Sequence, residues 1–118
     1  MTNLFKNILN IKKFILMAEI KIKSPAEGVL GRLDQVENIV RQYEKGGADI
    51  ISAVVEQKRF GGDLNMIDRI KSVSRLPIFC KDFISDKKQL VEIKAHGADA
   101  VLLLAMHVSR ENLRILFD

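Results

Sequence analysis

Residues 97–104 have the sequence GADAVLLL, and residues 46–55 have the closely similar sequence GGADIISAVV. In both stretches a glycine that can end a helix is followed by an alanine, an aspartate and a short apolar run typical of a buried strand. The repetition predicts the same helix-to-strand turn at two places in the chain.

Strand-like and helix-like segments alternate around these two turns. Compact apolar runs predict strands at 15–22, 48–55, 78–81 and 100–104. Helical spacing of apolar residues predicts two helices between them, one with Val36, Ile39, Val40 and Tyr43 on its apolar face and one with Leu64, Ile67, Ile70 and Val73. Two more helices are predicted at about 86–96 and 109–117. Because parallel neighbours need long crossover connections, this order predicts an α/β fold of about four β/α units, with parallel strands and outer helices.

The first residues have a different pattern from the rest of the chain. Apolar residues recur there with helical spacing, at Leu4, Phe5, Ile8, Leu9 and Ile11. We therefore expect a short N-terminal helical segment at 1–13, followed by the strand–helix domain at 14–118.

The formal net charge of +4 does not predict nucleic-acid binding. The excess of lysine lies within residues 1–25, and the remaining 93 residues carry basic and acidic side chains in equal number. That part has no basic stripe interleaved with aromatic residues, which nucleic-acid binding would require. We expect no nucleic-acid partner.

Cysteine content and hydropathy exclude several further classes of protein. Cys80 is the only cysteine, which rules out an intrachain disulfide framework and a cysteine-cluster metal site. The apolar run at 14–18 is far shorter than the roughly 20 residues of a membrane span. We expect a cytoplasmic protein with no membrane association, no cofactor and no metal.

Three charged residues are predicted to meet at one end of the sheet. Glu19 and Lys21 share a strand face, and Lys81 has the corresponding parity in the third strand. All three lie near the C-terminal ends of their strands, where active sites of βα-barrels form. Each alone is more often a solvated strand end or a structural ion pair, but the three together favour a site with a carboxylate that holds a lysine acid.

Four stretches resemble indole-3-glycerol-phosphate synthases. Residues 18–28 (AEIKIKSPAEG) resemble that family's first-strand signature, and residues 60–64 (FGGDL) its loop after the second strand. Residues 76–84 (LPIFCKDFI) are similar to its third-strand motif, and residues 97–104 to its fourth strand. The resemblance covers about residues 14–117 and implies half of a (β/α)8 TIM barrel.

The resemblance implies a lyase that closes the pyrrole ring of 1-(2-carboxyphenylamino)-1-deoxyribulose 5-phosphate, with loss of carbon dioxide and water. Lys81 would be the general acid, Lys21 would hold the carboxylate and phosphate end of the substrate, and Glu19 would orient the lysines. Substrate-binding roles would fall to Ser24 at the phosphate and to an apolar wall of Phe60, Phe83, Val54 and Leu102.

The sequence also departs from the family pattern. Ile22 and Val55 stand where the family often has arginine and threonine, and the family's catalytic base and phosphate cradle belong to strands five to eight. We therefore expect the chain to need a complementary C-terminal half-barrel or to form a homo-oligomer. The alternative is a half-barrel without catalysis that serves as a self-associating or regulatory binding module.

Overall fold

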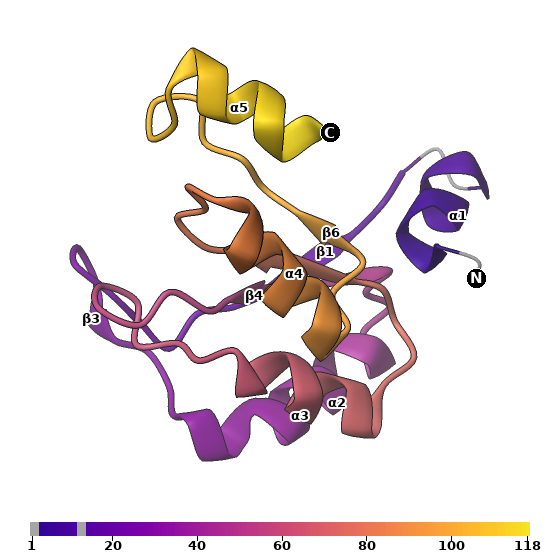
Figure 1. Cartoon of the computed structure of the whole chain (residues 1–118). Coiled ribbons are helices and arrows are strands. Elements are labelled where there is room, and N and C mark those ends of the chain that lie inside the picture. The colour runs from indigo at the N-terminus through magenta and orange to yellow at the C-terminus, as the bar shows by residue number, and fades with distance from the viewer. Residues whose placement is uncertain (1–2, 12–13) are drawn as a thin grey trace.

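The computed structural model describes residues 3–11 and 14–118 and contains a four-stranded parallel sheet (Figure 1). Its strands are β1 Met17–Ile20, β4 Ile50–Val54, β5 Ile78–Lys81 and β6 Ala100–Val101, in the spatial order β1-β4-β5-β6. All three pairings within this sheet are parallel, so the predicted four-stranded parallel sheet is confirmed.

A helix follows each strand of the main sheet; the first three of these helices lie on the outer face of the sheet, and the last packs next to the third (Figure 1). They are α2 Val36–Lys45, α3 Asn65–Val73, α4 Lys87–His96 and α5 Arg110–Phe117, with a short 3-10 turn at Leu33–Gln35 before α2. Two of these helices begin at side-chain caps, because Asp86 accepts a hydrogen bond from the Gln89 amide and Ser109 accepts one from the Asn112 amide.

The repeated glycine–alanine–aspartate turn has the same structure in both copies. Gly47 and Gly97 have φ angles of +97° and +108°, in the left-handed region that glycine tolerates. The aspartates then close the turn: Asp49 accepts a hydrogen bond from the Leu16 amide, and Asp99 accepts one from the Ile78 amide, at 3.0 and 2.9 Å. Each aspartate therefore ties the start of its own strand to the start of the preceding strand in the sheet.

The core lies between the outer face of the sheet and the helices. Outward-facing strand residues such as Ile20, Ile51 and Cys80 are almost completely buried there. The helices contribute Val36, Val40, Met66, Ile67, Ile70 and Ile93 to this layer. Burial of this many aliphatic side chains is the main source of stability in a domain of this size.

The N-terminal helix α1, Leu4–Ile11, lies against the N-terminal ends of the strands. Phe5 stacks on Phe79 of β5 with ring centroids 6.0 Å apart, and Asn3 donates a hydrogen bond to the Asp99 carbonyl, immediately before β6. The helix lies within the segment expected at 1–13, of which residues 1, 2, 12 and 13 are outside the described part.

Three strands are shorter than expected, and one hairpin was not predicted. The run at 15–22 does not continue as a strand, because β2 Lys23–Ser24 and β3 Gly28–Val29 form an antiparallel hairpin directly after it. The Ile22 carbonyl accepts hydrogen bonds from the Leu30 and Gly31 amides, which turns the chain out of the main sheet. The expected strands at 48–55 and 100–104 are likewise reduced to β4 and β6.

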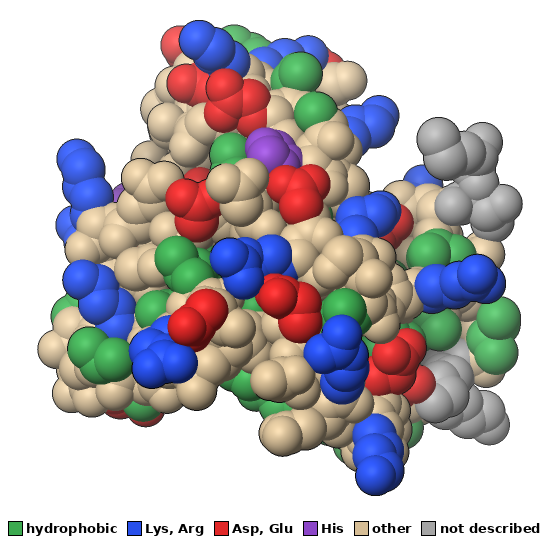
Figure 2. Space-filling view, turned by 90° about the horizontal axis from the view of Figure 1, so that it is seen from below, with side chains coloured by type: hydrophobic (Ala, Val, Ile, Leu, Met, Phe, Trp, Pro, Cys, Tyr) green, Lys and Arg blue, Asp and Glu red, His purple; other side chains and the backbone are tan. Residues whose placement is uncertain are grey.

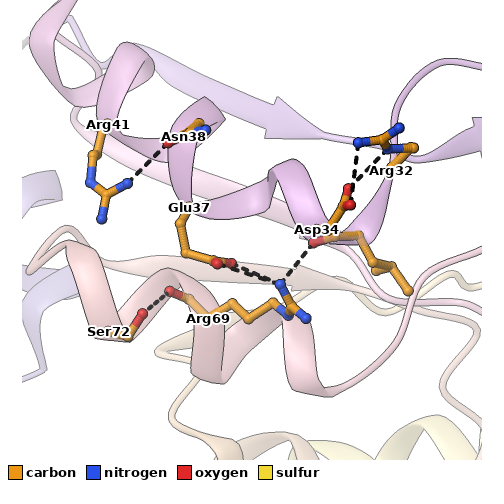
Figure 3. Close-up of polar contacts among 8 residues, drawn as sticks. Arg32, Asp34, Glu37, Asn38, Arg41, Arg69 and Ser72 are labelled. Atoms are coloured by element: carbon orange, nitrogen blue, oxygen red, sulfur yellow. Dashed lines mark hydrogen bonds and ion pairs between the residues drawn. The ribbon is translucent and has the colours of Figure 1, made fainter.

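Polar contacts on the outer surface link the helices to one another. Arg69 of α3 donates to the Glu37 carboxylate of α2 and to the Leu33 carbonyl, each at 3.2 Å (Figure 3). Figure 2 shows a face on which basic and acidic side chains alternate without a large patch of one sign. Exposed ion pairs of this kind typically contribute less than about 1 kcal/mol each, so we expect core packing to determine stability.

We expect Met66→Ala to lower the free energy of unfolding by about 2–5 kcal/mol, because Met66 is fully buried and its truncation leaves a cavity. Met106→Ala is the matched control, since Met106 is fully exposed and its loss should change stability by less than about 0.5 kcal/mol. Urea denaturation of both variants at one protein concentration measures the difference. Equal effects would show that the core does not lie where the structure has it.

Candidate active site

A cavity of about 290 Å³ opens at the C-terminal ends of the strands. It is lined by Glu19, Lys21, Val54, Glu56, Phe60, Lys81, Asp82, Phe83, Leu102 and Leu104. Seven of the eight residues expected from the sequence thus share one cavity, and the eighth, Ser24, lies on the adjoining hairpin.

Two residues that line this cavity, Glu19 of β1 and Lys81 of β5, form an ion pair. The Lys81 ammonium lies 2.9 Å from Glu19 Oε1, and Ser52 of the intervening strand β4 donates to the same oxygen at 3.3 Å. The side chains of Lys81 and Glu19 are 37% and 35% exposed, so both remain accessible to a ligand. The Tyr43 hydroxyl donates to the Glu19 backbone carbonyl at 2.6 Å and ties β1 to α2.

Lys21 also lines the cavity but pairs with a different carboxylate from Lys81. Its ammonium is 2.7 Å from Glu27 Oε1. The hydrogen bond that Lys21 donates to Glu27, together with the charges of Glu27 and Glu19, raises the pKa of Lys21 above its ordinary value, although desolvation opposes this shift. Lys21 therefore stays protonated at neutral pH, which suits a fixed cation better than a proton donor.

Ser24 does not line the cavity. It is buried at the end of β2, where its hydroxyl accepts a hydrogen bond from the Glu27 amide at 3.0 Å and lies 3.3 Å from Glu27 Oε1. Ser24 and Lys21 are thus joined through one glutamate that sequence reasoning did not identify.

Aromatic side chains form one wall of the cavity. The rings of Phe60 and Phe83 lie 6.3 Å apart in a tilted arrangement. The Arg59 guanidinium lies 5.2 Å from the centroid of the Phe83 ring, and His107 meets the same ring edge-on at 4.4 Å. His107 is an exposed residue that the sequence did not single out.

Glu56 holds the loop that carries Phe60. Its carboxylate accepts hydrogen bonds from the backbone amides of Lys58, Arg59 and Phe60 at 3.1, 2.8 and 2.9 Å. Gly62 closes the loop so tightly that an added Cβ would lie 2.3 Å from the Val54 carbonyl oxygen. No sequence signal distinguished Glu56 from an ordinary solvated glutamate.

Asp82 is a second acidic residue of the cavity that the sequence did not single out. Partial burial, with the nearby charge of Glu56, raises the pKa of Asp82 above its ordinary value, although a hydrogen bond from the Phe83 amide opposes the shift. Within residues 3–11 and 14–118, no group of three or more His, Cys, Asp or Glu side chains could hold a metal ion. No helix of that part is long and apolar enough to cross a membrane.

A parallel βα-sheet with lysines and a carboxylate at the C-terminal ends of its strands has the arrangement of part of a βα-barrel, a class of domain whose active sites form at this end. A family model described as indole-3-glycerol phosphate synthase matches residues 2–118. The chain belongs to the indole-3-glycerol phosphate synthase family.

Individual relatives agree with this assignment. The indole-3-glycerol phosphate synthase of Campylobacter hominis is 42% identical over 105 residues, which are 89% of this chain and 40% of the relative. That of Kineococcus radiotolerans is 39% identical over 103 residues, 87% of this chain and 38% of the relative. The chain thus spans about 40% of the length of the curated relatives it matches.

Among solved structures, a nitroalkane oxidase from Streptomyces ansochromogenes superposes with a TM-score of 0.47 and 16% sequence identity, over 82% of this chain and 34% of that one.

Cys80 should be unreactive in the folded protein. It faces the helices and is fully buried, and desolvation together with the charge of Asp82 raises the pKa of its thiol to about 12. Because only the thiolate is a good nucleophile, we expect negligible reaction with a disulfide reagent at pH 8. In denaturant the same thiol should react completely, and rapid labelling of the folded chain would contradict the observed packing of β5.

Proposed function

We propose that this chain supplies half of the active site of an indole-3-glycerol-phosphate synthase. The observation that carries the proposal is the pairing of Lys81 with Glu19 in a cavity that also holds Lys21 and an apolar wall. Such a cavity suits a substrate with an aromatic ring, a carboxylate and a phosphate. The reaction would convert 1-(2-carboxyphenylamino)-1-deoxyribulose 5-phosphate to indole-3-glycerol phosphate.

In this proposal Lys81 is the general acid. Ring closure places negative charge on the substrate's carbonyl oxygen, and a proton from the Lys81 ammonium neutralises it as the new carbon–carbon bond forms. Loss of carbon dioxide then leaves its electron pair in the ring, and a second protonation lets the hydroxyl depart as water. A base, which the family resemblance places on strands five to eight, would remove a proton from the neighbouring ring carbon to complete the pyrrole. Glu19, 2.9 Å from Lys81, orients the ammonium for both steps.

In this proposal the charged and apolar parts of the substrate bind to different parts of the cavity. Lys21 would hold the anionic end, with Ser24 beside it, because a protonated ammonium next to a hydroxyl is a good receptor for carboxylate or phosphate oxygens. Phe60, Phe83, Val54 and Leu102 would pack on the aromatic ring. All four line the cavity, which supports this division.

We expect Lys81→Met to reduce turnover by about 10²–10⁴, because it removes the proton donor while keeping most of the side chain's volume. The assay uses the chain mixed with a separately produced segment that carries the remaining strands of a relative's barrel. Lys88→Met, on the exposed surface of α4, is the control and should leave turnover unchanged. Near-normal turnover by Lys81→Met would remove Lys81 from the proposed mechanism.

A second proposal concerns the open sheet. Phe14, Leu16 and Met17 are exposed beside edge strand β1, and Ile115 and Phe117 are exposed on α5 beyond β6. An exposed strand edge flanked by apolar side chains favours association, either with a second copy or with a complementary half-barrel. This surface also supports the alternative in which the chain is a self-associating module without catalysis.

We expect the isolated 118-residue chain to form homodimers or larger species and to show no measurable synthase activity. Its cavity holds a candidate acid but leaves the bound substrate exposed to water, which weakens the electrostatic stabilisation of developing charge. Light scattering after size-exclusion chromatography, run beside the synthase assay, tests both parts. A monodisperse active monomer would contradict both, and an inactive monomer would contradict the association alone.

A further inference from the structure

Glu27 occupies the place where an anionic ligand group would bind. One of its carboxylate oxygens, Oε1, lies 2.7 Å from the Lys21 ammonium and 3.3 Å from the Ser24 hydroxyl. An ammonium and a hydroxyl that meet on a single oxygen form the same contact that they would make with an oxygen of a phosphate or carboxylate.

We infer that Glu27 is an internal competitor that must leave the Lys21–Ser24 anion site before the anionic group of a substrate can bind there. The inference rests on the proposed function in so far as the substrate is anionic. It adds that occupancy of this site is set by exchange between a side chain of the protein and the ligand.

The position of Glu27 makes this exchange possible without rearrangement of the fold. The residue lies in the turn of the β2–β3 hairpin, directly before Gly28, whose φ angle is +74°. The Glu27 side chain is 53% exposed, so rotation into solvent releases Oε1 while the backbone amide keeps its hydrogen bond to Ser24 Oγ. Lys21, which lines the cavity, would then be free to turn toward a ligand.

The charges around the cavity explain why competition between Glu27 and a ligand would change anion binding. Each lysine there has a carboxylate partner, Lys81 with Glu19 and Lys21 with Glu27, so the pairs together are neutral. Of the two carboxylates, Glu19 is tied to Ser52 and Lys81 across three strands, whereas Glu27 contacts its partners from a surface turn. Displacing Glu27 is therefore the easier way to present a free cation to an anion.

The test measures binding of two simple anions to the full chain by calorimetry. Inorganic phosphate represents the phosphate end of the substrate, and 2-aminobenzoate represents the aromatic carboxylate end. We expect Glu27→Gln and Glu27→Ala to bind at least one of them about 2- to 5-fold more tightly than the unmodified chain, the range expected for loss of a competing exposed ion pair. The anion that gains identifies which end of the substrate uses the site.

Two control variants make the result specific. Glu37→Gln removes a partly exposed carboxylate that pairs with Arg69 between α2 and α3 (Figure 3). Neither residue lines the cavity, so this variant should leave anion binding unchanged. Lys21→Met combined with Glu27→Gln should abolish the gain, because the gain depends on the freed ammonium. Circular dichroism confirms that each variant is folded.

Each other outcome overturns the inference. If Glu27 only positions Lys21, its replacement will weaken anion binding or leave it unchanged, and if no site exists, neither anion will bind to any variant. A gain that persists without Lys21 would also contradict it. Failure of the proposed function looks different: anion binding would respond to Glu27 as expected, but no indole-3-glycerol phosphate would form when the remaining strands are supplied.

Discussion

The apolar contact between the outer face of the sheet and helices α2 and α3 determines on which side of the sheet the candidate site residues of the strands lie. Ile51, Ala53 and Cys80 are completely buried in this contact, which fixes the parity of β4 and β5. Lys81 has the opposite parity and must therefore face the cavity. A slip of one residue would place its ammonium in the apolar layer, where an unpaired charge is strongly unfavourable.

The parallel register of the strands then places the polar side chains of the inner face next to one another. Glu19 pairs in register with Ser52, and Val54 with Lys81, so neighbouring strands present a carboxylate, a hydroxyl and an ammonium at adjacent positions. The Ser52 hydroxyl bridges the distance across β4 by donating to Glu19. The Glu19–Lys81 pair is thus held by backbone pairing of three strands and not by a loop, which gives it a defined geometry.

Local patterns predicted most of this arrangement, and long-range contacts account for what they missed. The glycine–alanine–aspartate turns, the strand at 78–81 and the parity of Glu19, Lys21 and Lys81 follow from neighbouring residues, and the structure confirms their placement. The β2–β3 hairpin depends on the Ile22 carbonyl meeting amides eight and nine residues later, a pairing that periodicity does not reveal. Glu27 and Glu56 were missed because charged residues in loops look alike until their partners are known.

The lysines of the cavity carry charge in surroundings that are only partly shielded from water. With side chains about one third exposed, the attraction between Lys81 and Glu19 acts through a high effective dielectric and is correspondingly weak. Covering the open mouth would strengthen this pair, and the contact between Lys21 and an anion, without any new hydrogen bond, because water would be excluded from around them. The Glu19–Lys81 pair and Lys21 are therefore already in place in this chain, while the strength of their interactions depends on what covers the open mouth of the sheet.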